Sequence, residues 1–193
     1  MSEAQTLRET PASSETHVDA QRDIDIQREV ERFVYREAYL QDRHEYDAWE
    51  ALWTDDGVYW IPANGDDIDP EREMSIIYDN RSRIALRIRQ LHTGRRIAQE
   101  PKSNLVRVIS NIEVIYRPAT ASANASANAG AADADIHVRA NAIIFESTAR
   151  RDTVWGTRCE YVLRRMDGTL RMARKKVMLV NNAKALPTLA FLI

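Results

Sequence analysis

Apolar residues recur at helical spacing between Asp25 and Asp42, with good helix formers between them. The positions on this stripe are Ile26, Val30, Phe33, Val34 and Ala38. The pattern predicts a helix that ends near Asp42. A second, shorter helix is predicted in "HEYDAWEALW", because Tyr46, Trp49 and Trp53 would share one of its faces.

A turn and a short strand are predicted next, in "TDDGVYWIP". Asp55, Asp56 and Gly57 are typical turn residues, and Pro62 closes the strand because it cannot donate to a neighbouring strand. The following stretch, "ANGDDIDPERE", is predicted to be a polar surface loop.

The segment "RSRIALRIRQLH", residues 81–92, fits two periods. Ile84, Ile88 and Leu91 follow a helical repeat, whereas Ile84, Leu86 and Ile88 alternate as in a strand. Periodicity alone leaves both interpretations open.

The second half of the chain alternates in the manner of β-strands. In "NLVRVISNIEVIYR" the predicted common face carries Val106, Val108, Ile112, Val114 and Tyr116. Further strands are expected around Ile136–Ser147, Val154–Arg165 and Leu170–Val180. Asp167 and Gly168 form a strong two-residue hairpin signal between the last two. Helices followed by a run of antiparallel strands indicate an α+β fold.

The domain organisation follows from changes in composition. Residues 1–22 are polar and are expected to be a disordered or extended tail. Residues 23–193 are expected to form a single α+β domain, with a flexible, Ala- and Asn-rich insert at residues 119–134. The apolar segment that includes Phe191, Leu192 and Ile193 is expected to be buried in the fold or at a subunit contact, since it would be sticky in water. These three residues are therefore the predicted assembly contacts.

Composition and charge narrow the classes of function. The 193 residues are 44% hydrophobic and 29% charged, with a formal net charge of −2, so nothing in the charge balance favours nucleic acid or a membrane surface. Basic residues do gather around one hairpin, at Arg164, Arg165, Arg171, Arg174, Lys175 and Lys176. Acidic neighbours make a salt-bridged or partner-facing strand face the favoured interpretation. No apolar run approaches the roughly 20 residues that span a bilayer.

Cysteine and histidine usage argues against a redox or metal centre in this chain. Cys159 is the one cysteine, so the paired thiolates of an iron–sulfur cluster are lacking and a reducing, cytoplasmic location is expected. Met1–Ala20 also lacks the pattern of a secretory signal. The histidines are His17, His44, His92 and His137. No two of them have metal-ligand spacing, and no nucleotide-binding or nucleophile motif is present.

One acid–base pair is conceivable. His44 and Asp47 lie about one helical turn apart and could act together with a tyrosine such as Tyr59. The favoured interpretation is that both belong to the solvated side of a short helix, where such pairs contribute little. The aromatic residues of this region, Trp49, Trp53, Tyr59 and Trp60, are expected to be substantially buried, with core packing favoured over a ligand pocket.

Five segments, in this order, resemble the β subunits of bacterial aromatic-ring-hydroxylating dioxygenases. They are "VERFVYREAYLQDRHEYDAWEALWTDDGVYWIP", "PEREMSIIYDNRSRIALRIRQLHTG", "EPKSNLVRVISNIEV", "GTRCEYVLRRMDGTLRMARKKVMLVNN" and "LAFLI". The resemblance covers almost everything from Ile26 to Ile193, apart from the insert, and "PEREMSIIYDN" looks like the branch acting on benzoate-type substrates. At one place the chain departs from the family: Leu105, Val106 and Arg107 follow Asn104 where the family often has Arg-Thr-Arg-His, so no role of that histidine is carried over.

The resemblance implies a cone-like fold similar to nuclear transport factor 2 and scytalone dehydratase, with amino-terminal helices packed on a curved antiparallel sheet. It favours the helical interpretation of Arg81–His92. It also implies a non-catalytic subunit of an NADH-dependent dioxygenase that performs cis-dihydroxylation of an aromatic, benzoate-type compound. The Rieske [2Fe-2S] cluster and the mononuclear Fe(II) would then lie in a catalytic α subunit, with electrons from NADH through a separate reductase. The implied assembly is a trimer of αβ pairs, with contacts to other β copies.

Two other hypotheses remain at this stage. One is a stand-alone dehydratase or isomerase of the same fold that uses His44 and Asp47, because fold does not fix function. The other is a small ligand-binding module without chemistry. Co-purification with an iron-bearing larger partner, against turnover by this chain alone, separates the three.

Overall fold

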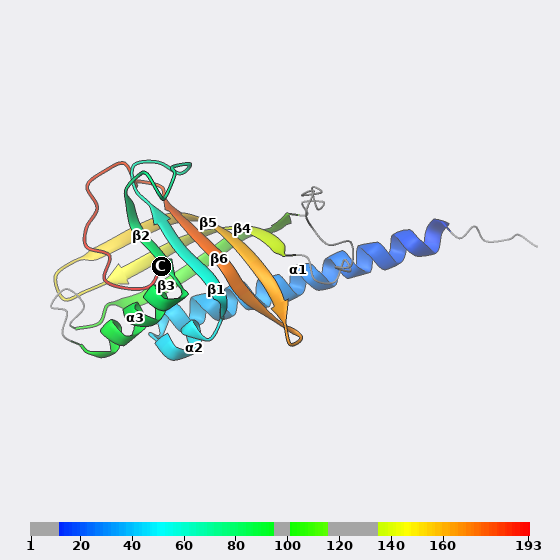
Figure 1. Ribbon diagram of the computed structural model, residues 1–193, viewed down its shortest axis with the longest axis horizontal. Coiled ribbons are helices and arrows are strands. Elements are labelled where there is room, and N and C mark those ends of the chain that lie inside the picture. The colour runs from blue at the N-terminus through cyan, green and yellow to red at the C-terminus, as the bar shows by residue number, and fades with distance from the viewer. Residues whose placement is uncertain (1–11, 95–100, 116–134) are drawn as a thin grey trace, which may run out of the picture.

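Three helices and six strands make up the part of the chain that the computed structural model describes, residues 12–94, 101–115 and 135–193 (Figure 1). The helices are α1 (Ala12–Asp42), α2 (Tyr46–Glu50) and α3 (Arg81–His92). The strands are β1 (Trp53–Pro62), β2 (Ser75–Asn80), β3 (Asn104–Ile115), β4 (Ile136–Ser147), β5 (Asp152–Met166) and β6 (Thr169–Leu179).

The strands form one twisted sheet in the order β2-β1-β6-β5-β4-β3, and the helices pack on one of its faces (Figure 1). Neighbouring strands are antiparallel except β1 and β6, which run parallel. The α+β class is confirmed, but the expectation of a purely antiparallel sheet is corrected to a mixed one. A parallel pair needs a long connection. The connection from β1 to β6 is long, because β2, β3, β4 and β5 lie between them in the sequence.

The core lies between α1, α2, α3 and the inner face of the sheet. Val30, Phe33 and Val34 of α1 are buried there, which confirms the predicted stripe. In α3, Ile84, Ile88 and Leu91 are buried while Leu86 is exposed, so the helical interpretation of this segment is correct. The Asn80 side chain caps α3 by accepting from the Arg83 backbone N–H at 3.1 Å.

Helix α1 begins at Ala12, which corrects the expected tail for residues 12–22. Residues 20–25 are exposed and make no core contact. The sequence therefore carries no apolar stripe there from which a helix could be predicted. Adding one residue to an existing helix costs far less than starting one. The helix that is buried around Val30 therefore extends toward the amino terminus. Residues 1–11 and the insert at 119–134 lie outside the described residues. Neither α1 nor any other described helix is long and apolar enough to cross a membrane.

The second helix is shorter than predicted, and β1 begins earlier. Trp53 belongs to β1 rather than to α2. Asp55, Asp56 and Gly57 lie within the strand, where the register to β6 shifts between Trp53 and Val58. A Cβ at Gly57 would stand 2.8 Å from Trp53 Cε3, so the glycine permits this close approach rather than a reversal of the chain.

The predicted face of β3 is split in two. Val106 and Val108 are exposed, whereas Ile112 and Val114 face the core. The register to β4 shifts between Ser110 and Glu113, and Asn111 adopts a φ of 53°. A shift of one residue exchanges the two faces of a strand, so a single alternating pattern could not describe both halves. Tyr116, the last member of the predicted face, lies outside the described residues.

The last three strands agree with the predictions. Strands β4, β5 and β6 pair in a long antiparallel ladder, and the turn between β5 and β6 is at Asp167 and Gly168. Both turn residues have positive φ, 50° and 74°, as the tight hairpin turn requires. This ladder is the rigid support for the polar groups inside the fold.

Candidate functional site

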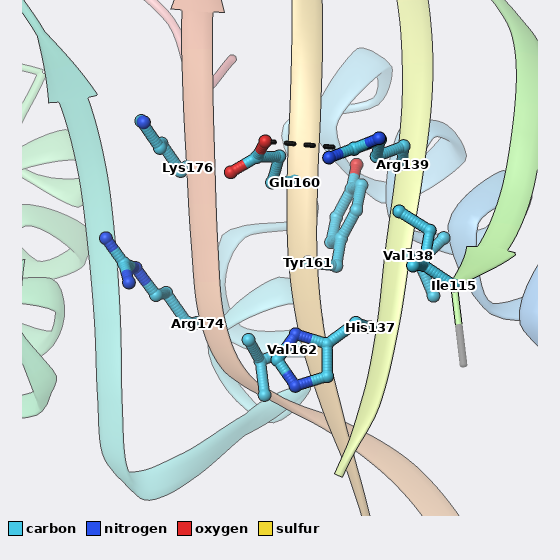
Figure 2. Close-up of a pocket in the computed structure, with 9 residues that line it drawn as sticks. All are labelled: Ile115, His137, Val138, Arg139, Glu160, Tyr161, Val162, Arg174 and Lys176. Atoms are coloured by element: carbon cyan, nitrogen blue, oxygen red, sulfur yellow. Dashed lines mark ion pairs between the residues drawn. The ribbon is translucent and has the colours of Figure 1, made fainter. Parts of the chain in front are cut away.

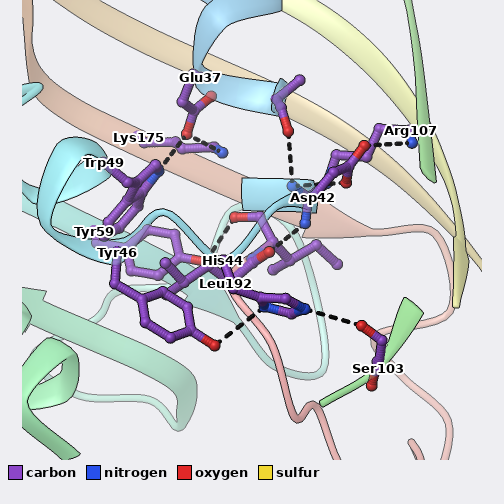
Figure 3. A network of polar contacts seen from close by, with 12 residues as sticks. Glu37, Asp42, His44, Tyr46, Trp49, Tyr59, Ser103, Arg107, Lys175 and Leu192 are labelled. Atoms are coloured by element: carbon purple, nitrogen blue, oxygen red, sulfur yellow. Dashed lines mark hydrogen bonds and ion pairs between the residues drawn. The ribbon is translucent and has the colours of Figure 1, made fainter. Parts of the chain in front are cut away.

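A buried carboxylate lies at the centre of the polar interior (Figure 3). Glu37 of α1 is 1% exposed. Its Oε1 accepts from Lys175 Nζ of β6 at 2.6 Å and from Trp49 Nε1 of α2 at 3.0 Å, and its Oε2 accepts from the Tyr161 hydroxyl of β5 at 3.0 Å. A buried charge is tolerated when it is paired and hydrogen-bonded in this way. The cluster therefore joins one helix layer to the sheet.

The groups around Glu37 are held in unreactive states. Burial, and after it the negative charge of Glu37, raises the pKa of Tyr161 well above its usual value. Burial also raises the pKa of the Cys159 thiol, against a smaller opposing effect of Lys175. A neutral phenol and a neutral thiol are poor bases and nucleophiles. The cluster is therefore suited to support rather than to chemistry.

Tyr59 fastens the segment 186–193 to the interior. Its hydroxyl donates to the Ile193 carbonyl at 2.6 Å and accepts from the Ile193 backbone N–H at 3.2 Å. The ring is fully buried, and this burial raises the pKa of the phenol. Tyr59 is thus a neutral group that both donates and accepts.

Arg107 is a second anchor of the same segment (Figure 3). It donates to the Leu192 carbonyl, and its guanidinium lies 3.2 Å from Asp42 Oδ1, while its backbone N–H donates to Asp42 Oδ2 at 2.9 Å. The Arg107 side chain is 2% exposed. Burial lowers the pKa of Arg107 and raises that of Asp42, and in both cases it outweighs their mutual attraction.

The predicted burial of Phe191, Leu192 and Ile193 is confirmed within the fold of this chain. Phe191 packs edge-on against Trp155 at 6.0 Å between ring centres, and the Arg107 guanidinium lies 5.8 Å from its ring. Because these side chains are already covered by the chain itself, their predicted contact with another subunit remains a prediction.

His44 and Asp47 do not form the conceivable acid–base pair in the described structure. His44 Nε2 lies 2.9 Å from the Ser103 carbonyl, and its Nδ1 lies 3.1 Å from the Tyr46 hydroxyl (Figure 3). Asp47 instead pairs with His92 Nε2 at 2.8 Å, on the surface. His44 has a φ of 56° between α1 and α2, so the two residues do not share a helix. Tyr59 bonds Ile193 and completes no set with them.

The aromatic group divides between the two faces of the sheet. Trp49, Trp53 and Tyr59 pack together inside, with ring centres 5.4 to 5.9 Å apart. Trp60 lies on the opposite face, under the Arg174 guanidinium at 5.1 Å and the Lys176 Nζ at 4.6 Å. All four side chains are buried, as predicted, and core packing is the role of three of them.

The basic run around the hairpin serves several purposes, which agrees with the expectation of a salt-bridged or partner-facing strand face. Arg164 pairs with Asp56 and Asp135, and Arg165 pairs with Glu29. Lys175 points inward to Glu37, whereas its neighbours point outward. In the described ranges no group of three or more His, Cys, Asp or Glu side chains comes together as a metal site.

A pocket of about 180 Å³ lies on the outer face of the sheet, away from the helices (Figure 2). Its charged and imidazole side chains come from three strands, β4, β5 and β6, and are those of His137, Arg139, Glu160, Arg174 and Lys176. Arg139 Nε lies 3.9 Å from Glu160 Oε1, the outer limit of an ion pair. The pocket therefore carries two arginines and one lysine against one carboxylate.

The sequence analysis did not predict that Glu37, Lys175 and Arg107 are interior residues, although a signal was present. Glu37 falls on the same helical stripe as Val30 and Val34. Lys175 and Arg107 occupy inward positions of their strands, where alternation predicts apolar residues. Charged residues in the buried phase of a period mark paired interior groups.

Comparison with known families gives one clear match. The family described as "Ring hydroxylating beta subunit" matches residues 36–184. Among curated proteins, the β subunit of toluate 1,2-dioxygenase from Pseudomonas putida is 33% identical over 91 residues, 45% of this chain and 56% of that protein. The aligned part thus spans little more than half the length of this relative.

Solved structures show the same fold. The β subunit of benzoate 1,2-dioxygenase from Burkholderia mallei superposes with a TM-score of 0.61 at 24% identity, covering 79% of this chain and 89% of that one. An NTF2-like protein with a cystatin-like fold from Novosphingobium aromaticivorans superposes with a TM-score of 0.52 at 16% identity, covering 86% and 90%. The expected similarity to the nuclear transport factor 2 fold is confirmed.

Breaking the central ion pair is expected to destabilise the fold. Glu37→Gln leaves Lys175 as an uncompensated buried charge, and Lys175→Met leaves Glu37 in the same state; each change should lower the free energy of unfolding by about 3–5 kcal/mol. In the double variant neither charge of this pair remains, so its loss of stability should be smaller than the sum of the two single losses. Urea denaturation of all four proteins measures this coupling, and strictly additive losses would contradict it.

The buried tyrosines are expected to make the fold sensitive to alkali. Their raised pKa values mean that above about pH 10 the unfolded chain loses phenolic protons that the folded chain retains. Stability should fall as the pH rises, by up to about 1.4 kcal/mol per pH unit for each tyrosine. Tyr161→Phe should flatten this slope, whereas Tyr39→Phe, at an exposed ring, should not. Denaturation midpoints measured between about pH 9 and pH 11 test this prediction. Equal slopes for wild type, Tyr161→Phe and Tyr39→Phe would contradict it.

Proposed function

The chain belongs to the ring-hydroxylating β-subunit family, and on this premise we propose that it is the structural small subunit of a multicomponent aromatic-ring dioxygenase. The observation that carries the structural role is that the buried polar side chains are bonded within the chain. Glu37, Tyr59 and Tyr161 are buried and bonded to other groups of the same chain, so they offer no free acid or base to a substrate. The subunit stabilises a catalytic partner instead.

The redox centres belong to that partner under this proposal. A Rieske [2Fe-2S] cluster needs two thiolates and two imidazoles, but Cys159 is the one cysteine of the sequence and is buried beside Thr157. The described residues of this chain therefore do not fit the cluster. The α subunit would hold the cluster and the mononuclear Fe(II), and a separate reductase would deliver electrons from NADH.

The proposed substrate class is an aromatic carboxylate. The relatives described above are named for toluate and benzoate, which both carry a carboxyl group on the ring. We infer cis-dihydroxylation of such a compound by the assembled enzyme. This chain contributes no group to the reaction, so its substitutions should change assembly and stability before they change regiochemistry.

The proposed assembly is a trimer of αβ pairs in the cytoplasm, with contacts between β copies. Phe191, Leu192 and Ile193 support it by shaping the subunit from inside. Tyr59 of β1 and Arg107 of β3 both bind this segment, which therefore links two strands that lie apart in the sheet order. Their effect on subunit contacts would then be indirect, through the positions of these strands.

Co-expression with the candidate larger subunit of the same gene cluster tests the proposal. An affinity tag on this chain should retain a brown, iron-containing partner, and the pair, supplied with its reductase and NADH, should oxygenate a benzoate-type substrate. The isolated chain should show no turnover. Oxygenation or dehydration catalysed by this chain alone, or iron bound by its own side chains, would overturn the proposal.

Deleting residues 191–193 is expected to impair both folding and assembly. Burial of each large apolar side chain contributes about 1.5–3 kcal/mol, so the loss of three is a large share of a typical domain's stability. The deletion should therefore lower solubility or dissociate the complex. Tyr59→Phe, which keeps the three side chains and removes the hydroxyl, should weaken stability by about 1–3 kcal/mol and leave the complex intact. A deletion variant that assembles fully and stays active would contradict the assigned role.

A further inference from the structure

A cluster of exposed apolar side chains covers one end of the outer sheet face. Six large side chains from β3, β4, β5 and the residue after β6 are 42–65% exposed: Val106, Val108, Ile143, Phe145, Val154 and Val180. These residues are called the apolar patch below. Contiguous apolar surface of this kind marks an interaction site more often than isolated exposed residues do.

The register of the strands shows that the patch is continuous. Val106 lies opposite Phe145, which lies opposite Val154. In the next row Val108 lies opposite Ile143. Side chains directly opposite each other on neighbouring strands are in contact range.

Val180 extends this second row. Ile143 lies opposite Gly156, and the Val180 backbone N–H donates to the Gly156 carbonyl at 3.0 Å. A Cβ at Gly156 would stand 3.1 Å from Val180 Cγ2, so Val180 lies over the glycine. Because Gly156 has no side chain, the surface of the patch is recessed between Ile143 and Val180.

The cationic pocket lies on the same face and is separated from the patch by one row of residues. Arg139 and Ile143 both point outward from β4, and Asn141 with its neighbour Arg158 forms the row between them. Four residues of strand span about 14 Å. A single structural element of a partner can therefore cover both features.

Lys176 is the unusual group of this pocket (Figure 2). Its side chain is 8% exposed, yet the carboxylate with which it pairs, Asp67, lies 3.6 Å away on a side chain that is 98% exposed. Stacking on Trp60 compensates part of the charge. Arg174, on the same ring, adds a second cation. A nearly buried ammonium with such a distant, solvated counter-charge favours an additional anion in the pocket.

The dimensions indicate a side chain rather than a free ligand. At about 180 Å³ the pocket is smaller than the roughly 300 Å³ at which pockets begin to enclose drug-sized ligands. A carboxylate side chain of a partner needs much less room. Its apolar surroundings would sit on the adjoining patch, which matches the apolar centre and polar rim of protein interfaces.

A second copy of this chain in a two-fold contact is a poor occupant, and a head-to-tail contact between β copies of the proposed trimer is an outcome that the test below separates. In a two-fold contact the same surface appears on both sides. The cations of one copy would then face either the cations of the other copy, which repel them, or its apolar patch, which leaves Lys176 and Arg174 desolvated without a counter-charge. A different protein with an acidic side chain beside an apolar ridge avoids both costs.

We propose that the outer face of the sheet is the docking surface for the larger oxygenase subunit, which sets an apolar ridge on the patch and an acidic side chain in the pocket beside Lys176. This inference rests on the proposed function, because that function supplies the partner. It adds the face of the subunit that is used and the chemistry that the partner presents.

Two substitutions test the two halves of the surface. Val108→Asp places a charge in the exposed patch, and Arg174→Glu reverses an exposed charge at the pocket. Each should weaken binding of the larger subunit at least about tenfold, since changes in the centre of an interface commonly reach this size. Leu86→Asp on α3, equally apolar and 46% exposed but outside the docking surface, is the matched control and should bind as wild type does. Circular dichroism and denaturation midpoints establish that all variants fold.

Titration of the tagged chain with the larger subunit, at low and at high salt, separates the outcomes. Weaker binding for both variants, with a salt dependence that Arg174→Glu reduces, supports the inference. If wild type and Leu86→Asp do not bind at all, the proposed function itself fails. If every variant binds like wild type, the function stands and the docking surface is wrong. Loss of self-association without loss of the larger subunit, or Arg174-dependent binding of free benzoate with an unchanged complex, also overturns it.

Discussion

The pairing of the Glu37 carboxylate fixes how α1 and α2 sit on the sheet. Three donors reach it from three elements, Trp49 from α2, Tyr161 from β5 and Lys175 from β6. Each donor would lose a charge-assisted hydrogen bond if its element moved, and an unpaired ion in the interior costs several kcal/mol. Apolar packing accepts small displacements, but this cluster accepts one arrangement. The rest of the interior is built around it.

The same requirement explains why the interior is suited to support. Side chains of the types that perform acid–base chemistry in other proteins make hydrogen bonds within this chain. Tyr59 donates to Ile193, and Arg107 donates to Leu192 and pairs with Asp42. These bonds bring a segment from the far end of the chain against β1 and β3. A subunit whose interior groups are held by such bonds presents its outer surface in one shape, and a rigid surface loses little entropy when a partner binds.

Local patterns predicted most elements because they depend on near neighbours. The stripe through Val30 and Val34, the Asp167-Gly168 turn and the three carboxyl-terminal strands are all confirmed. The errors have physical causes of their own. An extra residue near Asn111 exchanges the faces of β3, and the exposed first turns of α1 carry no apolar stripe, so neither could be read from periodicity. The resemblance to a known family, and not periodicity, predicted the helix at Arg81–His92.

The sequence by itself determined the α+β class, the buried aromatic group and the family, because these follow from local spacing and from motif order. Tertiary structure alone decided which charged residues are interior. Glu37 and Lys175 are separated by 138 positions, and no local pattern relates them. It also decided that His44 and Asp47 do not pair, since a three-residue break between α1 and α2 turns His44 toward Ser103 and Asp47 toward His92. Pairing across the fold depends on where distant segments meet, and that is fixed by the sheet order rather than by spacing along the chain.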